Sequence, residues 1–157
     1  EGLSPEIDWK LMMVGEGPEK VKAIEYIENA GLEDKILFLG NSNEIDKILC
    51  YSDLFLLPSE KESFGLSALE AMAHGVPVIS SNAGGISEVN IDGVSGYLAD
   101  IGDVDTMVVR AKELLSNDEL HSQFKKQAKQ QASKFSLEKI IGKYETIYSD
   151  AVASIQF

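Results

Sequence analysis

Residues 54–80, LFLLPSEKESFGLSALEAMAHGVPVIS, decide the fold of this chain. The stretch begins and ends with short apolar runs, each of a length typical of a strand that is buried on both faces. Between them, residues 64–74 have a helical pattern, with Ser63 as the predicted N-cap and Gly75 as the residue after the last turn. A strand, a helix and a strand in this order predict a crossover unit, and therefore a parallel sheet.

The same alternation extends in both directions from this stretch. Apart from residues 64–74, crossover helices are predicted at 20–30 and 43–52, and 103–155 form a helical tail with caps at Asp103, Asp118 and Ser136. The chain is therefore predicted to be α/β, with a Rossmann-like parallel sheet, crossover helices and a helical C-terminal tail. The predicted strands are 10–14, 36–39, 54–57, 76–80 and 96–98.

Composition limits both the size of the core and the class of partner. With 157 residues, 44% of them hydrophobic, the chain can form one core, so residues 1–157 are predicted to be one domain or part of one. The formal net charge of -12 disfavours binding to nucleic acid and to anionic membranes. Neither a signal peptide nor a membrane span is expected. The single cysteine, Cys50, lies in an apolar helical pattern, which predicts an inert core thiol and a reducing, cytoplasmic setting.

Two carboxylates mark the ends of the central loop and helix. If the helix begins at about Phe64, the amides of Phe64, Gly65 and Leu66 have no partners within it and favour an anionic or hydroxyl-rich ligand. Gly65 is expected to keep that approach open. Glu70 lies on a flank predicted to be buried, so it needs a partner there, unless it bonds a local group or turns to solvent. Glu62 also has a simpler interpretation: it complements the helix dipole, as acids just before a helix commonly do.

Taken together, the two acids predict a ligand with hydroxyls at both ends and phosphates between them, as in a nucleotide sugar. Glycines after the first and fourth strands, at 15–17 and 84–85, allow a ligand to approach the backbone. Gly15 and Gly17 are not followed by the third glycine of a dinucleotide fingerprint, so a nicotinamide cofactor is disfavoured.

The central stretch also resembles the signature of retaining glycosyltransferases with two Rossmann-like domains, the family-four group. In that signature a Glu, seven residues and a second Glu mark the donor site, as Glu62 and Glu70 do here. Further matches cover nearly the whole chain: Val14-Gly15-x-Gly17-Pro18, Phe38-Leu39-Gly40, Gly84-Gly85-x-x-Glu88 and Gly96-Tyr97.

The resemblance implies a role for each matched site residue. Glu62 is the implied catalytic residue and binds donor-sugar hydroxyls beside the anomeric carbon, while Glu70 binds the ribose hydroxyls. Transfer is expected to retain configuration and to need no metal or cofactor beyond the donor, UDP-N-acetylglucosamine. Asp103-Val104-Asp105 mimics a metal-binding motif, but its place at a helix start favours capping. The remaining implied donor-binding residues are Ser63, Phe64, Gly65, Leu66, Gly15, Gly17, Gly40 and Asn41.

The sequence departs from the family pattern at its beginning. The family holds donor phosphates with an Arg and a Lys from the first strand and helix of this domain, and residues 1–10 contain no such pair. The chain is therefore expected to be a fragment of the C-terminal domain that lacks the first βα unit and the N-terminal acceptor domain, and to be inactive alone. Three alternatives stay open: a GDP- or UDP-hexose transferase that builds polysaccharide or glycolipid, a non-catalytic nucleotide-sugar-binding domain, and a sugar-phosphate isomerase or epimerase.

Overall fold

The computed structural model describes residues 2–3 and 7–154, and it divides the chain into two compact units. The first unit is formed by Leu3–Tyr51 and the second by Ser52–Phe157, within the described residues. Every strand pair in either unit is parallel, as the alternation of strands and helices predicts. The strands form two sheets, however, where the sequence predicted one.

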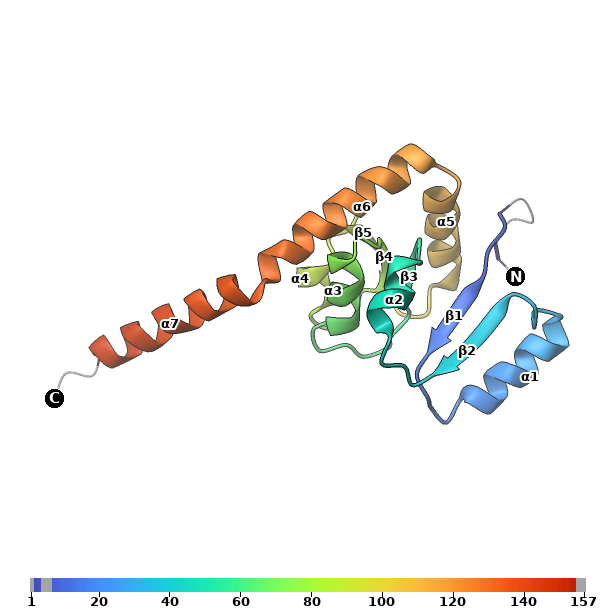
Figure 1. Ribbon diagram of the computed structural model, residues 1–157, viewed down its shortest axis with the longest axis horizontal. Helices are drawn as coiled ribbons and strands as arrows, with labels where there is room; N and C mark the ends of the chain where they lie inside the picture. Colours follow the sequence, from blue (N-terminus) through green and yellow to red (C-terminus); the bar gives the residue numbers. More distant parts are fainter. Residues whose placement is uncertain (1, 4–6, 155–157) are drawn as a thin grey trace. The chain divides into compact units, whose positions relative to one another are not determined.

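The first unit is a two-stranded sheet with helices (Figure 1). Leu11 pairs with Ile36, and the register is regular until it shifts between Met13 and Val14. The helix Lys20–Ala30 is followed by Gly31, whose left-handed backbone (φ 65°) closes the last turn of that helix. The elements are β1 (Leu11–Val14), α1 (Lys20–Ala30), β2 (Ile36–Gly40) and α2 (Ile45–Cys50).

The second unit is built on a three-stranded sheet of order β3-β4-β5. Every residue of the central strand β4 is buried, which explains why its sequence is apolar or small throughout. The elements are β3 (Phe55–Leu57), α3 (Leu66–Ala73), β4 (Val78–Ser81), α4 (Ile86–Val89), β5 (Gly96–Ala99), α5 (Val104–Leu115), α6 (Asp118–Ala132), η1 (Ser133–Phe135) and α7 (Leu137–Ser154).

Asn90 joins the strands of this sheet from inside the core. It is fully buried, and its side-chain amide donates to the carbonyl oxygens of Val78 (3.2 Å) and Tyr97 (3.1 Å) and to Ser80 Oγ (3.2 Å). Ser95 Oγ donates in turn to Asn90 Oδ1 at 3.2 Å. A buried polar side chain satisfied in this way fixes the relative position of β4 and β5.

Two of the predicted details of the helices are corrected. Asp103 caps α5 as predicted, accepting from the Thr106 amide at 2.9 Å, but α6 is capped by Asn117 and Asp118 is its first residue. Cys50 is exposed, so the prediction of a core thiol is wrong. In the short helix α2 the buried residue is Leu49, and the next residue necessarily points about 100° away from it.

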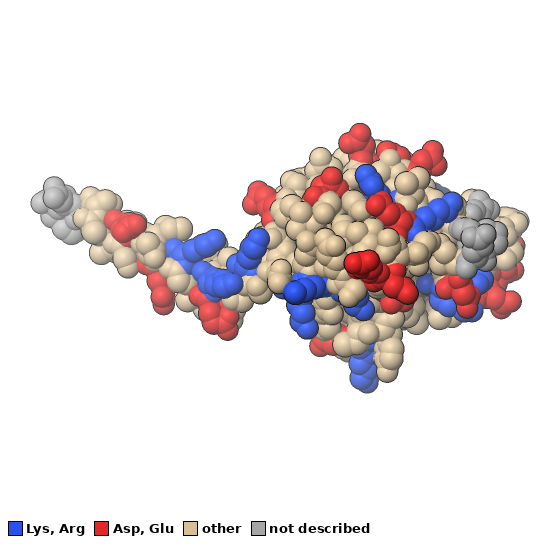
Figure 2. Space-filling view, turned by 90° about the horizontal axis from the view of Figure 1, so that it is seen from above, with Lys and Arg blue, Asp and Glu red and all other residues tan. Residues whose placement is uncertain are grey.

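The last helix, α7, carries its apolar side chains in water. Among its described residues none is buried, and Leu137, Ile147 and Val152 are 61–71% exposed. Figure 2 shows lysines and acidic side chains together along this helix, so its polar surface carries both signs of charge. These apolar side chains are therefore uncovered within the described part of the chain. None of the helices among residues 2–3 and 7–154 has the length and apolar character needed to span a bilayer.

Candidate functional site

The loop between β3 and α3 holds Glu62 against the backbone. Its Oε1 atom accepts a hydrogen bond from the Gly65 amide at 3.0 Å and a longer one from the Phe64 amide at 3.4 Å. These two amides, which the sequence predicted to have no partners within the helix, are therefore bound by a side chain of the preceding loop. The carboxylate of Glu62 lies just before the first turn of α3, where an acid complements the helix dipole, as the simpler interpretation of this residue expected.

The helix begins two residues later than predicted, and Ser63 does not cap it. Gly65 is the N-cap residue, so α3 begins without a side-chain cap. The reason is the left-handed backbone of Gly65 (φ 89°), which a right-handed helix cannot include, so helical geometry starts at Leu66.

Gly65 is required for packing rather than for access by a ligand. A Cβ atom at this position would lie 2.2 Å from Cδ1 of Ile86, a core residue of α4 with no exposed surface. The side chain of Phe64 is also engaged, because its ring meets that of Phe135 edge to face with centroids 5.8 Å apart. The expectation that Gly65 keeps an approach open for the ligand is therefore replaced by two constraints, backbone conformation and the contact with Ile86.

Glu70 lies on an exposed face of α3, where the sequence predicted a buried flank. Leu66 on the same face is 66% exposed and Leu69 is half-buried. The carboxylate lines a groove of about 450 Å³ between α3 and the end of α6, together with Lys129. Since Glu70 is hydrated, it needs no compensating partner, and it is free of the desolvation penalty that the sequence suggested.

In the first unit the predicted glycines meet at the ends of two parallel strands. The Gly15 amide donates to the Gly40 carbonyl at 2.7 Å, and both residues have positive φ (117° and 62°). Gly17 follows in the same loop, and its carbonyl accepts from the first amide of α1 at 3.2 Å. Asn41 is exposed directly after β2. The structure therefore brings Gly15, Gly17, Gly40 and Asn41 to the carboxyl edge of this sheet, where open parallel sheets bind ligands.

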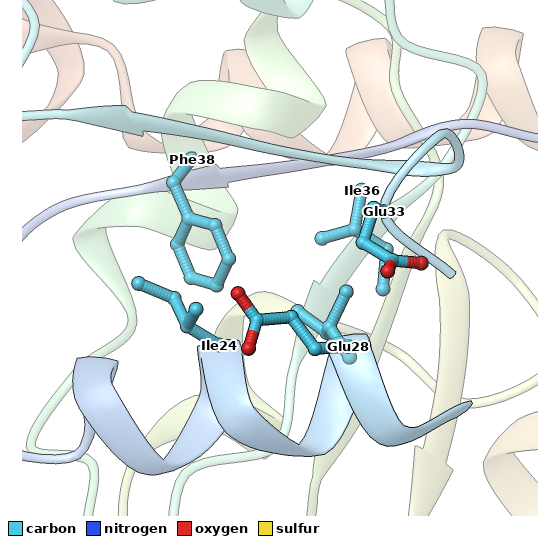
Figure 3. A pocket seen from close by; sticks show the side chains of 6 residues that line it. Ile24, Glu28, Glu33, Ile36 and Phe38 are labelled. Atoms are coloured by element: carbon cyan, nitrogen blue, oxygen red, sulfur yellow. The ribbon is translucent and has the colours of Figure 1, made fainter. Parts of the chain in front are cut away.

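The first unit also has a hollow, which is a poor place for a phosphate. It measures about 240 Å³ between α1 and β2, and Figure 3 shows Phe38 and Ile36 directed from the strand toward the helix. The polar side chains that line it, Glu28 and Glu33, are both acidic. Two carboxylates beside an apolar floor repel an anionic ligand.

The acidic pair Asp103 and Asp105 is explained by the start of α5. Both carboxylate oxygens of Asp103 are used by Thr106, one by its amide at 2.9 Å and the other by its hydroxyl at 2.6 Å. These hydrogen bonds from Thr106 hold the pKa of the Asp103 carboxyl below its usual range. The motif that resembles a metal site is therefore a helix cap, as the sequence predicted.

One feature of the site was misread from the sequence. Gly84 and Gly85, in the loop after β4, lie against the backbone of Glu62 and Ser63, where the sequence suggested approach by a ligand. The only signal available was the occurrence of two consecutive glycines, which does not say whether a ligand or another loop approaches them.

The chain resembles a known family and several known proteins over most of its length. The model of the family described as "Glycosyl transferases group 1" matches residues 3–131. N-acetyl-alpha-D-glucosaminyl L-malate synthase of Bacillus anthracis is 45% identical over 94% of this chain and 39% of its own length. 2-Deoxystreptamine N-acetyl-D-glucosaminyltransferase of Niallia circulans is 31% identical, again over 94% of this chain and 39% of its own. The chain therefore spans about two fifths of the length of these relatives.

The likeness to the malate synthase is also readable in the sequence itself. Within the family, the segments SEKESFGL, GLEDKILFLG and EKIIGKYETIYSD predict a resemblance to N-acetyl-glucosaminyl malate synthase of bacillithiol synthesis. The 45% identity to the Bacillus anthracis protein confirms this prediction.

Solved structures share the fold. Anabaena Alr3699/HepE in complex with UDP and glucose superposes with a TM-score of 0.84 at 26% identity, covering 94% of this chain and 42% of that one. TarM superposes with a TM-score of 0.81 at 30% identity, covering 88% of this chain and 28% of its own. Because the family model covers well over half of the residues, the chain belongs to the group 1 family of glycosyl transferases.

Proposed function

We propose that this chain is the donor-binding part of a retaining glycosyltransferase that moves N-acetylglucosamine from UDP-N-acetylglucosamine to a hydroxyl group of an acceptor. The observation that carries the proposal is the carboxylate of Glu62, fixed by the Phe64 and Gly65 amides at the carboxyl end of β3. Family membership and the relatives that act with N-acetylglucosaminyl groups support the donor.

Glu62 would act as an oriented acceptor for the donor sugar. Its Oε1 atom is bound by two backbone amides, which fixes the plane of the carboxylate without using Oε2 in those bonds. A carboxylate oxygen is a strong acceptor for sugar hydroxyls. Holding the hydroxyls beside the anomeric carbon aligns that carbon with the incoming acceptor, and such positioning is a large part of catalysis in group transfer.

Glu70 would bind the ribose of the nucleotide. It is exposed on α3, so a ribose can reach its two oxygens without a conformational change in the core. The loops at Gly15–Gly17 and at Gly40–Asn41 would supply backbone amides and contact the base. Retention of configuration places the leaving phosphate on the same face as the attacking hydroxyl, and electrostatic stabilisation of that phosphate would be the main catalytic contribution.

The complete enzyme would need sequence beyond this chain. The chain spans about two fifths of the length of the relatives, and the family resemblance implies that a first βα unit, carrying the Arg and Lys for the phosphates, and an acceptor domain belong to the same protein. The 157-residue chain alone would then bind donor weakly and transfer no sugar, and measurable turnover by it would refute this. A cytoplasmic setting stays a prediction that rests on cysteine content.

Calorimetry tests the nucleotide and the role of Glu70. The longer protein, meaning this chain together with the proposed first βα unit and acceptor domain, is expected to bind UDP more tightly than GDP. A preference for GDP would contradict the proposed donor. Glu70→Ala is expected to weaken UDP binding about tenfold or more, since a charge-assisted hydrogen bond contributes about 1.5–3 kcal/mol. The matched control is Glu25→Ala, which removes an exposed carboxylate from α1. Unchanged UDP binding by the Glu70 variant would favour a non-catalytic domain.

UDP-glucose is a second candidate donor because a specific neighbour favours it. HepE is in complex with UDP and glucose in one solved structure and with UDP-glucose in another, and these superpose on this chain with TM-scores of 0.84 and 0.82. Rates of UDP release from UDP-N-acetylglucosamine and from UDP-glucose, measured with the longer protein, distinguish the two. The higher kcat/KM identifies the donor.

A further inference from the structure

The loop that carries Glu62 is in direct backbone contact with the loop after β4. A Cβ atom on Gly84 would lie 1.7 Å from the Glu62 carbonyl oxygen and 2.9 Å from its carbonyl carbon. A Cβ atom on Gly85 would lie 2.5 Å from the Ser63 carbonyl oxygen and 3.6 Å from the Phe64 Cα. Both obstacles are backbone atoms, which cannot turn aside as a flexible side chain can.

We infer that Gly84 and Gly85 are positioning residues that set the orientation of the Glu62 carboxylate; the functional part of this inference rests on the proposed function. Few contacts separate the two glycines from the Glu62 carboxylate. The glycines determine how closely the backbone of Glu62 and Ser63 lies to the start of α4, and the Glu62 side chain returns to the Phe64 and Gly65 amides within the same loop.

The loop cannot relax away from such a change without disturbing the core. Gly65, at its other end, lies against Ile86, the first residue of α4, and Ile86 has no exposed surface. Ala83, just before the two glycines, is 4% exposed. The loop is therefore held at both sides, so a methyl group at position 84 or 85 would displace the segment that bears the carboxylate.

The two glycines differ in a way that separates crowding from backbone strain. Gly84 has φ 56°, in the left-handed region, so alanine there is both strained and crowded. Gly85 has φ -84°, which any residue adopts, so alanine there is only crowded. Gly93 (φ 68°) has open space around its Cβ position, so alanine there is strained but not crowded. Gly142 has open space and no positive φ, so alanine there is neither strained nor crowded.

Amide NMR of the 15N-labelled 157-residue chain tests the positioning. Glu62→Gln defines how the Phe64 and Gly65 amide signals move when the acceptor loses its charge. Gly85→Ala and Gly84→Ala are expected to move the same two signals, while Gly142→Ala and Gly93→Ala leave them in place. If Gly84→Ala does not fold, Gly85→Ala carries the test, because its backbone conformation suits alanine. Unmoved Phe64 and Gly65 signals in a folded Gly85→Ala chain would overturn the inference.

A kinetic measurement separates this inference from the proposed function. In the longer protein, Gly85→Ala is expected to lower kcat for UDP release from UDP-N-acetylglucosamine about a hundredfold, as misplacement by about 1 Å does elsewhere, with KM within about twofold. Gly142→Ala is expected to keep the wild-type kcat. If the amide signals move and both Gly85→Ala and Glu62→Gln retain wild-type kcat, the positioning stands and the role proposed for Glu62 is wrong. If Glu62→Gln alone loses activity, the functional part of the inference is overturned.

Discussion

Asn90 is bonded to Tyr97 across the sheet of the second unit, with 3.1 Å between the side-chain nitrogen of Asn90 and the carbonyl oxygen of Tyr97. The same nitrogen reaches the Val78 carbonyl at 3.2 Å, so one side chain spans β4 and β5 from within the core. Replacing Asn90 with Ala leaves these carbonyl groups buried without their donor. We expect the free energy of unfolding to fall by about 2–4 kcal/mol, measured by urea denaturation. Asn82→Ala, at an exposed position after β4, is the control and is expected to change it by less than about 0.5 kcal/mol.

The neighbouring serines of β4 offer a matched comparison. Ser80 Oγ accepts from Asn90, whereas Ser81 Oγ is buried without a hydrogen-bond partner among the described residues. Ser80→Ala is expected to lower the free energy of unfolding by about 1 kcal/mol. Ser81→Ala is expected to leave it unchanged or raise it slightly, because no hydrogen bond is lost and a buried polar group is removed. A larger loss for Ser81→Ala than for Ser80→Ala, by urea denaturation, would contradict this assignment.

The contact between Gly65 and Ile86 can be measured by a double-mutant cycle. Gly65→Ala brings a methyl group to within 2.2 Å of Ile86 Cδ1, and the positive φ adds backbone strain. We expect a loss of about 2–4 kcal/mol in the free energy of unfolding. Ile86→Val removes Cδ1 and with it the clash. The double variant is therefore expected to lose about 1 kcal/mol less free energy of unfolding than the sum of the losses of the two single variants. Strict additivity would show that the loss comes from strain alone. Gly102→Ala, with φ 83° and open space, gives the strain term independently.

Asp103 is expected to contribute a pH-dependent part of stability. Hydrogen bonds from Thr106 lower the pKa of Asp103 in the folded chain from its ordinary value of 3.8. The folded state therefore favours the charged carboxylate. Its contribution is fully present above the unfolded pKa and is lost as the pH falls through the folded pKa. Asp103→Asn keeps an acceptor without the charge, so the stability difference between wild type and variant should shrink as the pH falls from 6 toward 3. A difference that is constant over this range, by thermal unfolding, would rule out the assignment.

The sequence predicted the elements well and the details of the site poorly. The helix Lys20–Ala30 and the positions of all five strands agree with the structure to within two residues at each end, because periodicity and turn residues are local signals. The division into two sheets was not foreseen, since pairing between distant strands is not encoded in any local pattern. Glu62 and Glu70 are the two acids that the sequence proposes for the site, and the structure shows surroundings that differ from those predicted. The partner of the Phe64 amide, the exposure of Glu70 and the neighbour of Gly65 each depend on another segment or on one left-handed residue.

The contacts around Glu62 have a consequence for inheritance. Glu62, the amides that it binds, Glu70 and the two glycines all fall between β3 and α4, on one uninterrupted piece of chain. The pieces that must fit one another are thus translated together and would move together in any exchange of gene segments. Recombination would therefore transfer this module whole, with the carboxylate and its supporting contacts unaltered.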